Sequence, residues 1–170
     1  TKRIAREARI DPSKIHSIVH GTTLVTNTII ERKGAKVGLI TTKGFRDSLE
    51  MGKEIRYDLY DLHLEAPPTL VPRYLRRGVS ERTGPDGDEL LAFDQDEFLE
   101  VARSLIEDEK VEAIAICFMH AYRNSAHEQA AKEIFIKEFS DVPLSVSSEV
   151  APEIREFERA STACANAYVQ

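Results

Sequence analysis

The feature that most constrains the fold is an uninterrupted apolar run at residues 113–119. A run of that length is far too short to cross a bilayer, but it suits a buried strand. Before it, residues 94–106 carry the apolar stripe of an amphipathic helix opened by Asp94, and a second helical pattern starts at Asn124. A buried strand between two such helices indicates an α/β fold, with helices covering a sheet.

The rest of the chain repeats this alternation. We predict a strand at 15–20, a helix from the N-cap Thr22 to about Lys33, ended by Gly34, and a strand at 36–42. The further predicted elements are a short helix at 44–51, a long ordered loop at 52–72, a hairpin of strands 73–81 and 89–93 around Gly84-Pro85-Asp86-Gly87, a strand at 143–147 and a last helix with Pro152 in its first turn. We treat 1–170 as one domain, with a sub-division into 1–72 and 73–170 as an option.

Charge and cysteine content narrow the classes of function. The net charge of −6 and the pI near 5.4 argue against a nucleic-acid or anionic-membrane surface, since both need clustered Lys and Arg. Cys117 and Cys164 have no ligand-spaced neighbours, so we expect two reduced core thiols, a cytoplasmic location and no metal site. The N-terminal residues do not resemble a signal peptide.

The first candidate site is the run His20-Gly21-Thr22-Thr23, followed by Thr26 and Asn27. Gly21 lets the backbone approach a ligand, and a helix that starts here points free N–H groups toward the loop. Thr23, Thr26 and Asn27 share one polar face, which makes a cradle for a phosphate or carboxylate plausible. The alternative is structural: Thr22 caps the helix, Gly21 makes the turn and His20 ends a strand.

The second candidate site is residues 147–159. Glu149 and Glu153 suit a helix N-terminus, and the spacing of Arg155 and Arg159 predicts a shared helix face. The alternative is a solvated charged helix with internal ion pairs. The small residues that follow, 160–167, let another helix or a ligand approach closely.

The third candidate is His120, just past the buried strand, where α/β proteins often bind ligands. The alternative is that His120 and Tyr122 cap the sheet edge. Arg73 flanks the long loop and can close over a site. We expect His127 to be a surface residue of its helix.

Taken in order, these pieces resemble the N-terminal region of the hydantoinase A/5-oxoprolinase family, which also includes subunits of acetone and acetophenone carboxylases. The segments that carry the resemblance are His20-Gly21-Thr22-Thr23 with Thr26-Asn27, Glu31-Arg32-Lys33-Gly34-Ala35, residues 39–47, residues 57–62, Val71-Pro72-Arg73, Ser148-Glu149-Val150 and residues 156–162. Each match is weak by itself, but the ordered set is specific.

The resemblance implies a ribonuclease H-like fold of the actin, Hsp70 and sugar-kinase type with a mixed sheet, the cofactors ATP and Mg²⁺, and a hydantoinase B-type partner. The implied function is ATP-dependent opening of a cyclic amide (hydantoin or 5-oxoproline type) through a phosphorylated intermediate. The alternatives are a subunit of a ketone carboxylase and a non-catalytic assembly domain.

The resemblance also suggests roles for the candidate residues. Gly21, Thr22 and Thr23 would hold phosphate, and His20 and Asn27 would be catalytic by positioning the phosphate or the substrate. Second-rank candidates are Arg73, His120, Glu149, Arg155 and Arg159.

One departure from the family pattern concerns the first phosphate loop. Members normally begin with a strand and an Asp-bearing, Gly-Gly-Thr-rich loop, and this sequence starts after that point. We therefore expect an incomplete nucleotide-binding half, which alone neither hydrolyses ATP nor binds it tightly.

Overall fold

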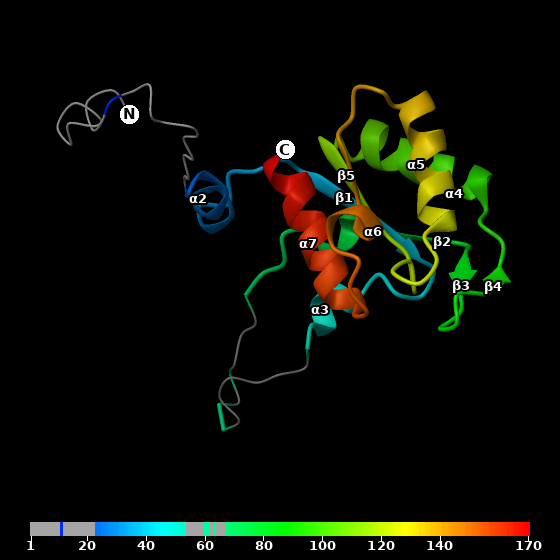
Figure 1. The fold of residues 1–170 in the computed structure, drawn as a ribbon. Helices are drawn as coiled ribbons and strands as arrows, with labels where there is room; N and C mark the ends of the chain where they lie inside the picture. Colours follow the sequence, from blue (N-terminus) through cyan, green and yellow to red (C-terminus); the bar gives the residue numbers. More distant parts are fainter. Residues whose placement is uncertain (1–10, 12–22, 54–59, 62, 64–66) are drawn as a thin grey trace.

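The computed structural model describes residues 11, 23–53, 60–61, 63 and 67–170. The elements in chain order (Figure 1) are α2 (Leu24–Ile30), β1 (Val37–Thr42), α3 (Ser48–Met51), the 3₁₀ helix η2 (Arg73–Leu75), β2 (Arg76–Val79), β3 (Arg82–Thr83), β4 (Glu89–Leu91), α4 (Gln95–Arg103), its π-helical continuation η3 (Ser104–Asp108), β5 (Ala113–Cys117), α5 (Ala126–Glu138), β6 (Leu144–Val146), α6 (Ser147–Val150) and α7 (Glu156–Val169). The predicted strand at 15–20 lies outside the described residues.

A four-stranded sheet forms the centre, with the order β2-β1-β5-β6 and parallel pairing throughout. Every residue of β1 and β5 is buried, as expected when helices cover both faces of a parallel sheet. The α/β prediction is confirmed. The expected mixed sheet is not seen in these four strands, because the antiparallel pair, β3 and β4, forms a separate two-stranded sheet.

Helices form a layer on each side of this sheet (Figure 1). On one side α7 lies along β5, with α3 and α6 near its first turns. The residues of α7 that enter the core are mostly small: Ala160, Ala163, Cys164 and Ala167. They let the helix approach the sheet closely, so most of the small-residue run serves packing. On the other side α4, η3 and α5 contribute Phe98, Leu105 and Phe135 to the core.

The predicted hairpin is correct at its turn and wrong in its first strand. Gly84 donates its N–H to Asp88 O at 2.8 Å, which closes the turn. The predicted strand at 73–81 instead divides into η2 and β2, and β2 pairs with β1 in the main sheet. Only Arg82–Thr83 pairs with β4, because the chain leaves the main sheet after Val79.

Several predicted helices begin or end elsewhere; the short helix predicted at 44–51, for example, covers only Ser48–Met51. The last helix starts at Glu156 with Arg155 as its N-cap, and Pro152 lies between α6 and α7. A separate turn forms at α6, where Ala151 donates its N–H to Ser147 O at 2.9 Å. The first helix ends at Ile30 rather than near Lys33, and its N-cap is Thr23.

Both cysteines are free and buried, as predicted. Burial raises the pKa of the Cys117 thiol to about 12 and also raises the pKa of Cys164 above its usual value. Among the helices of the described ranges, none is long and apolar enough to span a membrane. The sub-division at residue 72 stays a prediction, although strands from both parts share the sheet.

Candidate functional site

The carboxyl ends of β1 and β5 are the natural place for a site in this topology. These two strands are neighbours, and the chain continues from β1 to β2 on one side and from β5 to β6 on the other. Ligands of open α/β sheets bind outside the carboxyl ends at such a switch point. Buried polar residues gather there, and we treat this edge as the candidate site.

A chain of hydrogen bonds starts at the end of β1. The hydroxyl of Thr42 accepts from the N–H of Met119 at 2.8 Å and donates to the buried carboxylate of Glu81. The other oxygen of Glu81 lies 2.8 Å from Nδ1 of His127, and Nε2 of His127 lies 2.8 Å from Glu89. The chain links both central strands to α5 and to the hairpin.

His127 is therefore not the surface residue that the sequence suggested, because its exposed fraction is only 8%. Burial lowers the pKa of its imidazole, but hydrogen bonds and charge from Glu89 and Glu81 outweigh burial, and the pKa is raised overall. The ring also stacks on Phe93, with 6.1 Å between ring centroids. The two carboxylates therefore favour the charged form of His127.

The next residue, Glu128, binds the chain at the end of β5. Its fully buried carboxylate accepts from Phe118 N at 2.8 Å, Ser147 Oγ at 2.7 Å and Ser148 N at 2.8 Å. Three hydrogen bonds compensate much of the cost of burying a carboxylate. Glu128 thereby ties β5 to the turn at α6.

Arg159 fixes the same strand end from α7. Its guanidinium is fully buried and donates to Phe118 O at 2.6 Å and to Glu153 O at 3.0 Å. It also lies over the ring of Tyr122, 5.4 Å from the centroid. Arg155, in contrast, is the exposed N-cap of α7 with extended backbone angles. The shared helix face predicted for this pair is wrong, because Arg155 precedes the first helical turn.

His120 lies at this edge, as the sequence suggested. Its φ of 54° is unusual for a residue other than glycine, and its ring meets Tyr122 edge-on with centroids 6.0 Å apart. Its Nδ1 is buried without a hydrogen-bond partner. Tyr122 thus contacts both His120 and Arg159.

Thr23 and Asn27 do not lie at the carboxyl ends of β1 and β5. They belong to the exposed start of α2, with Asn27 Nδ2 3.5 Å from Thr23 Oγ1. Thr23 makes no side-chain capping bond. α2 lies near the C-terminal end of α7 (Figure 1), whereas Arg159 is in its first turn. His20, Gly21 and Thr22 lie outside the described residues.

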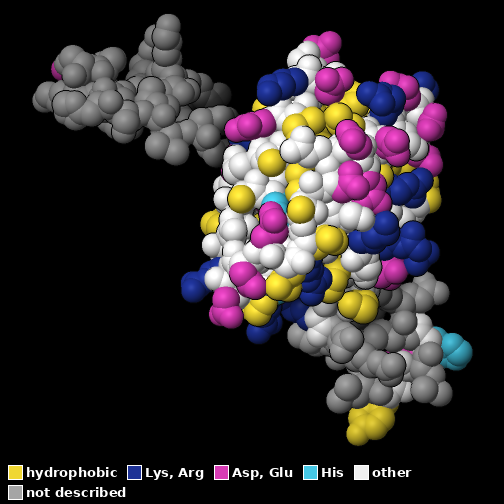
Figure 2. All heavy atoms as spheres, turned by 90° about the vertical axis from the view of Figure 1, so that its right-hand side faces the viewer, with side chains coloured by type: hydrophobic (Ala, Val, Ile, Leu, Met, Phe, Trp, Pro, Cys, Tyr) yellow, Lys and Arg dark blue, Asp and Glu magenta, His cyan; other side chains and the backbone are white. Residues whose placement is uncertain are grey.

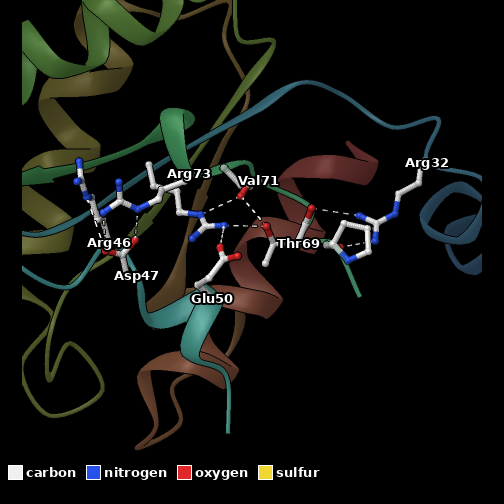
Figure 3. A network of polar contacts seen from close by, with 9 residues as sticks. Arg32, Arg46, Asp47, Glu50, Thr69, Val71 and Arg73 are labelled. Carbon is white, nitrogen blue, oxygen red and sulfur yellow. Dashed lines mark hydrogen bonds and ion pairs between the residues drawn. The ribbon is translucent and has the colours of Figure 1, made fainter. Parts of the chain in front are cut away.

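Arg73 and Glu149 are engaged in ion pairs. Arg73 binds Asp47 through two hydrogen bonds of 2.8 and 2.9 Å (Figure 3), which lower the pKa of Asp47 and raise that of Arg73. Glu149 accepts from Lys132 at 2.6 Å, and this bond lowers its pKa. Both pairs are at the surface, away from the buried contacts of Arg159.

Sequence reasoning missed Glu81, His127 and Glu128. A signal existed for His127, because it precedes Ala131 by four residues and Phe135 by eight, on the buried stripe of α5. Glu81 had no such signal, because its burial depends on where the chain leaves β2. In the described parts of the chain, no cluster of His, Cys, Asp or Glu forms a metal site.

Comparison with known proteins now bears on this geometry. The family model described as the hydantoinase/oxoprolinase N-terminal region matches residues 1–139. The chain belongs to this family.

Solved structures of the family share the fold. The crystal structure of the ATP-dependent caprolactamase from Pseudomonas jessenii superposes with a TM-score of 0.83 and 35% identity, covering 98% of this chain and 25% of that one. The nucleotide-free structure of acetone carboxylase gives a TM-score of 0.77 and 32% identity over 85% of this chain and 22% of that one.

A curated relative with a third named activity is also similar to this chain. The 5-oxoprolinase 1 of Arabidopsis thaliana is 32% identical over 99% of this chain, which corresponds to 14% of that protein. Relatives also include subunits of multi-subunit enzymes, such as the acetone carboxylase beta subunit and the acetophenone carboxylase gamma subunit. The chain spans a quarter or less of the length of these relatives.

Proposed function

We propose that the chain is part of an ATP-dependent enzyme that opens a cyclic amide through a phosphorylated intermediate. The observation that carries the proposal is the 35% identity and TM-score of 0.83 to a caprolactamase over 98% of the chain. Transfer of a phosphoryl group from ATP to the amide oxygen would activate the amide carbon, so that water can add to it. The ring C–N bond would then break with protonation of the nitrogen, and hydrolysis of the resulting acyl phosphate would release inorganic phosphate and the open-chain acid. The partner we expect is a hydantoinase B-type subunit or domain.

Within this proposal, Thr23 and Asn27 contact the phosphate or the substrate, together with His20, Gly21 and Thr22. The exposed hydroxyl and amide of Thr23 and Asn27 fit a ligand that approaches from solvent. The helix dipole contributes little, because α2 has only seven residues. The described residues offer no carboxylate cluster for Mg²⁺.

The test is Thr23→Ala in the complete enzyme with its partner subunit. We expect ATP-coupled turnover to fall roughly 10- to 100-fold while the thermal unfolding midpoint is unchanged. Thr28→Ala is the matched control, because the Thr28 hydroxyl is bonded to the Leu24 carbonyl of its own helix. Unchanged turnover in Thr23→Ala would remove Thr23 from the site.

A carboxylase subunit is the second candidate, supported by the likeness to acetone carboxylase. A panel of cyclic amides and of ketones with bicarbonate, each assayed for ATP consumption by the complete enzyme, separates the two.

An assembly domain is the third candidate, supported by the exposed Leu24, Val25 and Ile30 on α2. If none of the compounds in the panel leads to ATP consumption, the assembly-domain alternative is favoured.

A further inference from the structure

The hairpin of β3 and β4 has a strand edge that the described part of the chain leaves unpaired. Its sheet has only two strands, in the order β3-β4, so no described strand pairs with the outer side of β4. All three residues of β4 are exposed, and β4 is the outermost strand in Figure 1. An unpaired edge presents a row of backbone N–H and C=O groups on which another strand can add.

Two leucines distinguish this edge from ordinary exposed surface. Leu90 is 59% exposed and Leu91 is 52% exposed. Neighbouring residues of a strand point to opposite faces, so each face of β4 carries one uncovered leucine. Single exposed leucines are common on protein surfaces, but two on an unpaired strand offer apolar contacts to both faces of an added strand.

Contacts with the body of the protein hold the hairpin in position. In the turn, Nδ2 of Asn124 donates to Gly87 O at 2.8 Å. In β4 itself, Glu89 lies 2.8 Å from Nε2 of the buried His127, whose ring stacks on Phe93. A two-stranded hairpin by itself is marginally stable in water, and these contacts compensate for that. An added strand therefore meets an edge that is already ordered, which lowers the entropy cost of binding.

Negative charge is concentrated around this edge. Residues 80–103, which include the hairpin and α4, contain eight acidic and two basic side chains. This stretch alone carries the whole net charge of −6, and the remaining residues are balanced. Figure 2 looks onto the side of the molecule that carries the hairpin, and acidic and hydrophobic side chains lie next to one another there.

Part of this charge is neutralised within the protein. Glu97 pairs with Lys43 at 3.0 Å, and the carboxylates of Glu81 and Glu89 flank His127. Within the described ranges, four exposed acids of the hairpin and α4 form no ion pair: Asp86, Asp88, Asp96 and Glu100.

The nearby cations do not cancel these four acids. Arg82 lies over the ring of Phe45, 4.6 Å from its centroid. Arg123 is exposed beside the turn, where a Cβ added to Gly87 would lie 3.2 Å from its Cγ. Arg103 is the last residue of α4, away from the hairpin. The surface around β4 is therefore acidic on balance and favours a basic partner.

We propose that the outer edge of β4 pairs with an extended segment of another polypeptide, in which apolar residues are flanked by Lys or Arg. The segment adds a third strand beside β4, its apolar side chains cover Leu90 and Leu91, and its cations face the unpaired carboxylates. A second copy of this chain does not fit, because it would place acid against acid. The proposal does not rest on the proposed function.

Titration of the 170-residue chain with three blocked heptapeptides tests the kind of partner. The first is Lys-Thr-Val-Val-Val-Thr-Lys, the second has Glu in place of both Lys, and the third is the first with N-methylated valines. Because β4 has only three residues, we expect a Kd of about 100 μM for the first peptide in calorimetry. The second should bind at least about tenfold more weakly, and the third, which lacks backbone donors, should not bind. Equal binding of the second or third peptide, or no binding of the first, overturns the proposal.

A matched pair of variants tests the location. Leu90→Lys and Ile136→Lys each add one positive charge at an exposed apolar position, the first on β4 and the second on α5. Leu90→Lys should weaken binding of the first peptide at least about tenfold, and Ile136→Lys less than about twofold. In NMR titration of the unaltered chain, the backbone amide signals of β4 should shift. Equal effects of both variants, or amide shifts confined to α4, contradict the proposal.

A milder pair covers the case in which Leu90→Lys does not fold. Asp88→Asn removes one unpaired charge next to β4, and Asn suits a turn as well as Asp does. We expect it to weaken binding of the first peptide about twofold to fivefold, whereas Asp141→Asn, at an exposed acid between α5 and β6, leaves the affinity unchanged. Thermal unfolding shows whether each variant is folded. Unchanged affinity in a folded Asp88→Asn overturns the role of charge in the proposal.

Discussion

At the scale of single residues, His127 is held by two carboxylates that decide its charge. Both ring nitrogens lie 2.8 Å from a carboxylate oxygen, and a neutral imidazole has only one N–H to donate. Two such bonds to carboxylates therefore favour the protonated ring. The raised pKa of His127 has the same cause.

This charge makes stability depend on pH. Because the folded pKa of His127 is raised, its stabilising contribution is complete below the unfolded pKa of about 6.5 and is lost as pH rises through the folded pKa. His127→Gln should cost about 1–3 kcal/mol of unfolding free energy at pH 6 and progressively less at higher pH. Urea denaturation from pH 6 to 9 measures this. His63→Gln, at an exposed histidine, is the control. A cost for His127→Gln that is constant or grows with pH would contradict the assignment.

Arg159 and Arg155 form a useful pair of variants because they have the same side chain and lie four residues apart, but Arg159 is buried and Arg155 is exposed. Arg159→Met removes the buried guanidinium with its two hydrogen bonds and leaves Phe118 O with only the longer bond from Ala121 N at 3.4 Å, so we expect a loss of about 2–4 kcal/mol. Arg155→Met should change stability by less than about 0.5 kcal/mol, because its side chain is 73% exposed. Thermal and urea unfolding check both values. Equal effects would mean that Arg159 is not the buried anchor.

At the scale of elements, α7 is fixed at both ends. Its first turn binds the end of β5 through Arg159, and its last turn meets the start of β1, where Ala35 donates its N–H to Tyr168 O at 3.0 Å. Gly34 lies against Tyr168 so closely that an added Cβ would be 2.3 Å from the ring and 2.4 Å from the carbonyl oxygen. The glycine that the sequence suggested as a helix cap therefore serves helix docking.

Gly34→Ala tests this contact. Since the Tyr168 carbonyl belongs to the backbone and cannot turn aside, we expect a loss of about 1–3 kcal/mol in urea denaturation. Lys33→Ala is the control, because the Lys33 side chain is 74% exposed. If both variants unfolded at the same urea concentration as the wild type, the close packing of α7 on this turn would be refuted.

At the scale of the whole molecule, charges are spread over the surface in both signs, as the face shown in Figure 2 illustrates. Thr23 and Asn27, two of the residues proposed for phosphate, and the residues of the carboxyl edge lie near opposite ends of α7. The described chain thus offers two separate polar regions, and it spans a quarter or less of its relatives. We expect a closed nucleotide site to draw on more than one such region.

We therefore predict weak ATP binding by the 170 residues alone, with a Kd above about 1 mM in calorimetry. ATP hydrolysis should be undetectable. The complete enzyme, measured under the same conditions, is the positive control. A micromolar Kd for the 170 residues would refute this prediction.

Local sequence signals predicted the features that depend on neighbours in the chain. Asp94 accepts from the Glu97 N–H at 2.9 Å as the N-cap of α4, and the Gly84-Pro85-Asp86-Gly87 turn closes as expected. β5 is buried as its apolar run indicated. These features need only backbone chemistry and periodicity within a few residues.

The sequence by itself determined the α/β class, the central strand β5 and the family, because apolar runs, caps and ordered motifs are local or linear properties. Tertiary structure decided which polar residues are buried together. Glu81, the neighbours His127 and Glu128, and Arg159 come from three different segments and meet only because parallel strands bring their carboxyl ends to one edge. Their charges are tolerable in the core only once those partners are in place, which no single segment of sequence specifies.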